Sequence, residues 1–123
     1  MQKRILVIED DCIASKLYLA FLNKSGFATK AVTNAEDAEK VLEDDKINII
    51  LTDIKLPGID GIEFTKKIKK KCNIDVIVIT GYSSEYTYED AINSGASDLL
   101  FKPVKLNELL LRIGSIYNKK AKL

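Results

Sequence analysis

Four short apolar runs in this chain lead directly into side chains that can do chemistry. The acids, the hydroxyl and the amine found there are Glu9, Asp10, Asp53, Thr80 and Lys102. If the runs are parallel strands, their carboxyl ends share one edge of a sheet, which is where open α/β sheets bind ligands. Carboxylates crowded at such an edge raise one another's pKa unless a cation neutralises them. The pattern therefore predicts an acidic, cation-binding site with a hydroxyl and an amine beside it.

The available donors indicate a hard divalent cation. The chain has no histidine, which excludes histidine as a catalytic base and as a metal ligand. Mg²⁺ prefers about six oxygen ligands and usually keeps several waters. We therefore expect a carboxylate–Mg²⁺ site, with Thr80 and Lys102 placed to contact an added oxyanion. A phosphoryl group is the expected oxyanion, because aspartate can act as its nucleophile while a metal and a lysine neutralise the developing charge.

Asp53 taken alone has a simpler interpretation. It follows the apolar run INIILT and precedes KLPG, and both Asp and Pro are ordinary turn formers. A turn residue, however, does not explain the other four side chains at strand ends. Asp11, next to the acidic pair, is interpreted as the cap of the following helix.

The elements that must position these residues alternate along the chain. Strand-like runs occur at Arg4–Ile8, Phe27–Val32, Ile47–Asp53, Ile74–Thr80 and Ser97–Phe101. The first helix is predicted from Ile13 to a Gly26 C-cap, and the second from an Asn34 cap to about Glu43. The third is predicted over Gly61–Lys71. The fourth is predicted from a Ser83 or Ser84 cap to Ser94, with Gly95 following, and the fifth from about Lys105 to Tyr117. Strands alternating with such short crossovers predict one doubly wound parallel sheet with right-handed connections.

Finer expectations follow from the local patterns. The buried face of the first helix is predicted to consist of Ile13, Leu17, Ala20 and Phe21. Thr29 and Lys30 interrupt the second strand, which is typical of an edge strand. After Tyr117 the basic tail NKKAKL is expected to fray. The lysines of the helix Gly61–Lys71 are interpreted as a solvated face.

Composition limits the class of protein. With 123 residues and 46% hydrophobic residues, the chain is expected to form one domain around one core. Its net charge of +1, without an acidic or basic half, argues against a nucleic-acid binder. Cys12 and Cys72 form no CxxC pair, which suits a reducing compartment. No signal peptide or membrane-spanning run is recognised, so we expect a cytoplasmic protein that does not associate with membranes.

Four motifs in this order cover nearly the whole length of the chain: ILVIEDD, LTDIKLPGIDG, VIT-G and GASDLLFKP. Together they resemble the response-regulator receiver domain of two-component signalling, the family of the chemotaxis regulator. The resemblance implies a flavodoxin-like (βα)5 fold with a five-stranded parallel sheet in the order 2-1-3-4-5. It also implies a single receiver domain over residues 1–123, for which no output domain is expected.

The resemblance assigns roles at the predicted site. Asp53 is the expected phosphoacceptor. Mg²⁺ would be held by Asp53, by Asp10 directly, by Glu9 through water and by the backbone carbonyl of Lys55.

Two further residues take roles from the same resemblance. Thr80 would reach a phosphoryl oxygen and Lys102 would pair with the phosphoryl group. The Lys102-Pro103 peptide bond is expected to be cis.

Some positions depart from the family pattern. Leu99 stands where the family commonly has an aromatic residue that moves together with the threonine. Tyr82, Tyr86 and Tyr88 are therefore the candidates for the output switch and for contact with partners. Lys55 and Tyr82 flank the site without an acid or amide to orient water, which predicts slow loss of the phosphoryl group.

The resulting hypothesis is a switch rather than an enzyme. A histidine kinase or phosphotransfer protein would phosphorylate Asp53, and the target would bind the face formed by the helix at 83–94, the strand Ser97–Phe101 and the last helix. A haloacid-dehalogenase-type phosphohydrolase is an alternative, but it would need an acid at Lys55. A nucleotide or flavin module would need a glycine-rich phosphate loop, and neither GxxxxGK nor GxGxxG occurs. A phosphorylation-independent docking scaffold is disfavoured by the intact Asp53, Thr80 and Lys102.

Overall fold

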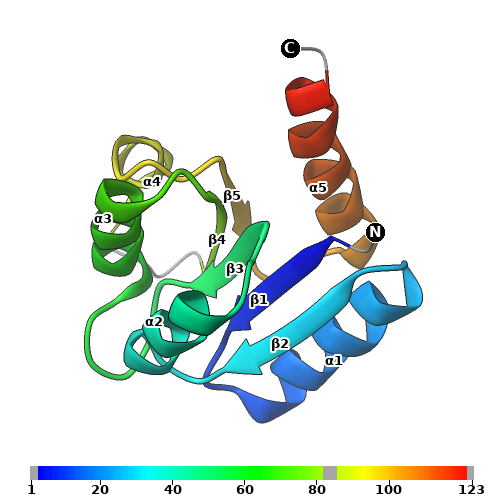
Figure 1. Cartoon of the computed structure of the whole chain (residues 1–123), viewed down its shortest axis with the longest axis horizontal. Coiled ribbons are helices and arrows are strands. Elements are labelled where there is room, and N and C mark those ends of the chain that lie inside the picture. Colours follow the sequence, from blue (N-terminus) through cyan, green and yellow to red (C-terminus); the bar gives the residue numbers. More distant parts are fainter. Residues whose placement is uncertain (1–2, 82–85, 122–123) are drawn as a thin grey trace.

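The computed structural model describes residues 3–81 and 86–121. In this part of the chain strands and helices alternate from end to end (Figure 1). The strands are β1 (Arg4–Ile8), β2 (Ala28–Val32), β3 (Ile49–Asp53), β4 (Asp75–Thr80) and β5 (Asp98–Phe101). The helices are α1 (Cys12–Lys24), α2 (Ala35–Asp44), α3 (Gly61–Lys71), α4 (Tyr88–Asn93) and α5 (Leu106–Ala121). None of these helices combines the length and apolarity that crossing a membrane would require.

All five strands are parallel and lie in the order β2-β1-β3-β4-β5, which confirms the predicted fold. Figure 1 shows α1 and α5 on one face of the sheet and α2, α3 and α4 on the other. The register sets Ile8 opposite Thr52 and Asp53 opposite Ile79, so β1, β3 and β4 end at nearly the same level. The residues that follow these ends therefore meet at one edge.

Two apolar layers bury both faces of the sheet. Alternate residues of each strand point to opposite faces. Leu6, Ile50 and Val78 pack with α2, α3 and α4, whereas Val7 and Leu51 pack with α1 and α5. A parallel sheet covered on both faces needs nearly continuous apolar strands, and β3 is buried at every position. This explains why an ionisable residue such as Asp53 can only end such a strand.

The helix starts carry local caps that the sequence encodes. Asp11 accepts from the backbone N–H groups of Ile13 and Ala14, and Asn34 accepts from that of Asp37, as predicted. Gly26 and Gly95 follow the ends of α1 and α4 with φ of 101° and 102°, a conformation that glycine adopts without strain.

The predicted buried face of α1 is wrong except at Phe21, which is half-buried and packs against the core layer on this side of the sheet. Ile13 is 81% exposed and Leu17 56% exposed, whereas Tyr18 and Leu22 are buried against the sheet. The apolar periodicity of α1 fits two overlapping stripes, and only packing selects between them.

Two helix limits also differ from the prediction. α4 begins at Tyr88 and is capped by Thr87, whose side chain forms a capping box with Asp90, rather than by a serine at 83 or 84. At the other end of the chain, α5 continues to Ala121, so the segment expected to fray is helical up to that residue.

The start of α3 lies against the backbone of β3. The N–H of Gly61 donates to the carbonyl of Ile54 at 2.8 Å. A Cβ atom on Gly61 would lie 2.1 Å from the carbonyl oxygen of Asp53, far inside van der Waals contact. Glycine at this position therefore lets α3 approach the residue that ends β3.

We predict that Gly61→Ala lowers the free energy of unfolding by about 2 kcal/mol, because α3 or β3 must shift to admit the methyl group. Gly114→Ala is the matched control, since a Cβ there meets nothing within 4 Å. In a helix interior this control substitution should stabilise by about 0.5–1 kcal/mol. Urea unfolding of both variants measures the two effects, and equal changes would contradict the steric argument.

Candidate functional site

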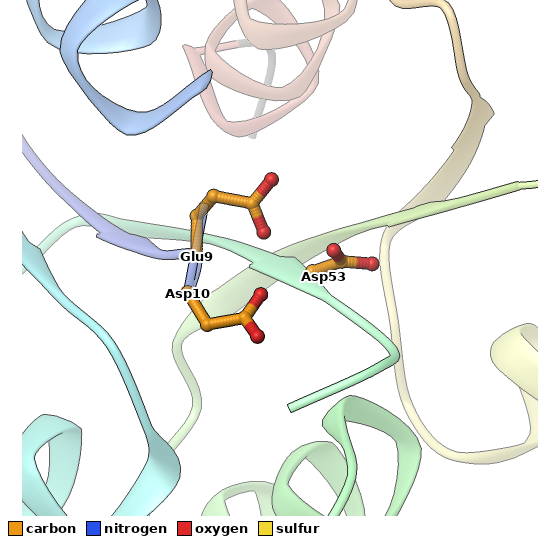
Figure 2. Close-up of side chains that lie close together, drawn as sticks. All are labelled: Glu9, Asp10 and Asp53. Atoms are coloured by element: carbon orange, nitrogen blue, oxygen red, sulfur yellow. The ribbon is translucent and has the colours of Figure 1, made fainter. Parts of the chain in front are cut away.

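Three carboxylates gather where β1 and β3 end. Figure 2 shows Glu9 and Asp10, which follow β1, turned toward the same region as Asp53 at the end of β3. One oxygen from each of them lies within 4.8 Å of the others. Glu9 is 2% exposed and Asp53 8% exposed, while Asp10 faces solvent. The sheet thus brings together the three acids that the sequence predicted.

Lys102, which follows β5, reaches across the sheet edge to this group. Its Nζ lies 2.7 Å from Oδ2 of Asp53 and 3.3 Å from Oε1 of Glu9. Burial by itself lowers the pKa of the ammonium, but the hydrogen bond and charge of Asp53, together with Glu9, outweigh it and raise the pKa. Lys102 therefore stays charged and bridges two carboxylates. The Lys102-Pro103 bond is cis, as predicted.

The surroundings of Glu9 disfavour its charged form. Its pKa is raised from 4.5 to about 7, chiefly because burial disfavours the charged form and also because Asp53 lies beside it, while Lys102 acts in the opposite direction. Among the described residues none donates a hydrogen bond to its buried Oε2. A buried oxygen without a donor, beside two further hard oxygens, fits a divalent cation.

Thr80 and Lys55 line a pocket beside Asp53. This pocket of about 590 Å³ is lined by Asp10, Asp53, Ile54, Lys55, Leu56, Asp60, Thr80, Gly81, Tyr86 and Lys102. The Thr80 hydroxyl donates to the carbonyl of Gly81 at 3.2 Å, and the backbone N–H of Lys55 donates to Oδ1 of Asp53 at 3.4 Å. The pocket thus combines acids, a hydroxyl and two lysines around one aspartate.

Comparison with known proteins identifies the family. The family model of the response regulator receiver domain matches residues 5–114. The chain belongs to this family. Proteins of the family are receiver domains of two-component response regulators, which take phosphoryl groups from histidine kinases and act on downstream targets.

Two curated transcriptional regulatory proteins are among the relatives of this receiver domain. The transcriptional regulatory protein CrdR of Helicobacter pylori is 36% identical over 96% of the chain and 56% of its own length. The protein AruR of Pseudomonas aeruginosa is 31% identical over 97% of the chain and 51% of its own length. The chain thus spans about half the length of these curated relatives.

Solved structures show the same fold. A CheY-like receiver domain protein from Methanospirillum hungatei superposes with a TM-score of 0.92 at 29% identity, covering 99% of the chain and 98% of that protein. A two-component response regulator from Clostridium difficile gives a TM-score of 0.91 at 27% identity, covering 97% and 98%.

The candidate switch residues of the receiver lie in different environments. Leu99 is 5% exposed within the core layer under α2, α3 and α4. Tyr88 at the start of α4 is 55% exposed, whereas Tyr86 is half-buried and packs against that same layer. Tyr82 lies outside the described residues. Of the two tyrosines that the structure describes here, only Tyr88 is therefore largely exposed.

Sequence reasoning did not assign Asp60 to the pocket. Asp60 accepts from the backbone N–H of Glu63 at 2.8 Å through Oδ1 and caps α3, and its Oδ2 accepts from the Tyr86 hydroxyl at 2.7 Å. The spacing of Asp60 and Glu63 before an apolar helix was a cap signal, but nothing local pointed to a tyrosine 26 residues away.

We predict a specific pH dependence for the metal-free protein. The raised pKa of Glu9 means that its contribution to stability is fully present below about pH 4.5 and is lost as the pH rises through 7. Glu9→Gln removes this loss, so the variant should gain stability relative to wild type across that range, reaching on the order of 3 kcal/mol. Urea unfolding at a series of pH values in EDTA measures this difference.

Asp45→Asn provides the control. The pKa of Asp45 is lowered from 3.8 by its hydrogen bond to Lys30, so Asp45 remains ionised throughout the range tested. The difference between this variant and wild type should be flat from pH 4.5 to 7. A flat difference for Glu9→Gln as well would contradict the assigned shift.

Proposed function

We propose that this receiver domain accepts a phosphoryl group on Asp53 from the phosphohistidine of a kinase or phosphotransfer protein, and that the modification changes its affinity for a protein target. The observation that carries the proposal is the position of Asp53. It is the buried end of β3, contacted by Lys102 and opening into a pocket of about 590 Å³.

The reaction needs one nucleophile and neutralisation of charge. An oxygen of Asp53 attacks the phosphorus, the nitrogen–phosphorus bond of the donor breaks, and the departing imidazole keeps the bonding electron pair and takes up a proton. Charge develops on the phosphoryl oxygens during transfer. Lys102, whose Nζ lies 2.7 Å from Asp53, and the Thr80 hydroxyl, which lines the same pocket, would contact these oxygens.

The cation site completes the charge balance. Asp10, Asp53 and Glu9, with the backbone carbonyl of Lys55, would hold Mg²⁺. When bound, Mg²⁺ supplies positive charge at the transferring phosphoryl group. Without Mg²⁺, the Lys102 ammonium forms ion pairs with both Glu9 and Asp53.

We propose that the protein target binds the face formed by α4, β5 and α5. A phosphoryl group adds about two negative charges at Asp53, enough to bias a surface with two arrangements. Exposed Tyr88 and Phe101 lie on this face beside the ion pair of Arg112 and Asp98. Aromatic residues and arginine are enriched at protein contact surfaces.

The proposed activity is that of a switch that loses its phosphoryl group slowly. Lys55 lines the pocket with an exposed ammonium, and an ammonium has no acceptor that could orient an attacking water. A phosphohydrolase of the haloacid-dehalogenase type would place an acid there. The lysine thus favours a phosphoacceptor over an enzyme that turns over.

Mg²⁺ should stabilise the wild-type protein against heat in a concentration-dependent manner, because it binds the folded state. Asp10→Asn removes one ligand and should weaken Mg²⁺ binding by about tenfold or more. Asp44→Asn, which neutralises an exposed acid outside the cluster, should bind as wild type does. Melting temperatures over a Mg²⁺ titration provide the measurement, and equal affinities for all three proteins would disprove the assigned site.

Phosphorylation itself is tested with acetyl phosphate, Mg²⁺ and the intact mass of the protein. Wild type and Asp44→Asn should each gain one phosphoryl group, Asp53→Asn should gain none, and EDTA should prevent the gain. If the mass of the wild-type protein does not increase, the proposal is contradicted. Rapid release of phosphate without an accumulated phosphoprotein would favour the phosphohydrolase instead.

A further inference from the structure

One hydrogen bond joins two connections that flank the Asp53 pocket. The Tyr86 hydroxyl donates to Oδ2 of Asp60 at 2.7 Å, and Oδ1 of Asp60 accepts from the N–H of Glu63 at 2.8 Å. Both oxygens of this carboxylate are thus engaged. A neutral hydroxyl bound to a carboxylate is a charge-assisted hydrogen bond, which is stronger than one between two neutral groups.

The acceptor side of this bond leads directly to Asp53. Asp60 caps α3, and the next residue, Gly61, donates to the carbonyl of Ile54 and lies against that of Asp53. The position of Asp60 is therefore tied to the backbone that carries the Asp53 carboxylate.

The donor of this hydrogen bond, Tyr86, lies next to the start of α4. Tyr86 immediately precedes Thr87, the cap of this helix, which has only six residues and a single buried side chain among them, Ala91. A helix with so little buried surface depends on contacts at its ends for its position. The bond to Asp60 supplies such a contact.

Tyr86 is also part of the pocket wall. Its ring packs against the core layer that contains Ile54 and lines the pocket together with Asp60 and Thr80. The hydrogen bond to Asp60 raises the pKa of Tyr86 to about 12, so the hydroxyl remains protonated and keeps donating at neutral pH. The ring is held in place by packing on one side and by this bond at its tip.

We infer that Tyr86 is a positioning residue for the reaction at Asp53: held by Asp60, it closes the α3–α4 side of the pocket and lengthens the life of the phosphoryl group. The inference rests on the proposed function. In the step affected, a water oxygen attacks phosphorus, the bond between phosphorus and the Asp53 oxygen breaks, and inorganic phosphate leaves as the carboxylate is regenerated. A fixed apolar wall limits the approach of that water.

Decay of the phosphoprotein measures the effect. Each protein is phosphorylated with acetyl phosphate and Mg²⁺, the donor is removed, and the loss of mass is followed with time. Tyr86→Phe and Asp60→Asn, which retains a capping side chain, should each decay about three- to tenfold faster, which is less than the full effect of losing one hydrogen bond to a charged group. The double variant should decay no faster than Tyr86→Phe alone, because both substitutions act on the same bond: Tyr86→Phe removes the donor, and Asp60→Asn removes the charge of the acceptor.

Two controls separate positioning from general loosening. Tyr117→Phe makes the same chemical change on α5, in the other core layer and beside Lys3 at the opposite end of β1, and should decay as wild type does. The rate of phosphorylation by acetyl phosphate should stay within about twofold in every variant, because the nucleophile and Lys102 are unchanged. A loosened fold would change both rates.

The outcomes separate this inference from the proposed function. If wild type gains no phosphoryl group, the proposed function fails and the inference fails with it. If wild type is phosphorylated but Tyr86→Phe decays at the wild-type rate, or if the effects of Tyr86→Phe and Asp60→Asn add, the inference alone is overturned.

Discussion

Repulsion between carboxylates at the carboxyl edge of the sheet is the constraint around which this site is built. Glu9, Asp10 and Asp53 approach within 4.8 Å, and two of them are almost fully buried. The cost of this arrangement is visible in the raised pKa of Glu9 and in its buried oxygen without a donor. Lys102 relieves part of it, and the remainder favours binding of a cation.

The rigidity of the sheet holds these acids close together despite their repulsion. β1 and β3 are central strands buried on both faces, so the acids at their ends cannot move apart without disturbing two apolar layers. Gly61 lets α3 lie directly on the backbone of Asp53 and adds a third support. In such a scaffold, a change of charge at Asp53 is relieved more readily by shifts in connections and short helices than by the sheet. α4, which is tethered at Tyr86, has fewer buried residues than any other described helix.

Much of the fold could be predicted because its signals are local. Apolar runs marked the five strands to within two residues, caps at Asp11 and Asn34 marked two helix starts, and α3 was predicted with the observed limits. Two of the predictions that failed concerned the buried face of α1 and the start of α4. α1 offers two apolar stripes, and Ile13 and Leu17 lie on the one that packing left exposed. The start of α4 was predicted at a Ser83 or Ser84 cap, whereas Thr87 and Asp90, which were not considered, form the reciprocal capping pair.

The sequence by itself determined which residues end the strands, because strand length and apolar pattern are short-range properties, and parallel topology then required those ends to meet. It therefore specified Glu9, Asp10, Asp53, Thr80 and Lys102 as one site. Only the tertiary structure decided that Lys102 bridges Glu9 and Asp53, and that Tyr86 binds Asp60 across the pocket. These contacts depend on distances between residues far apart in the chain, and such distances exist only once the layers have packed.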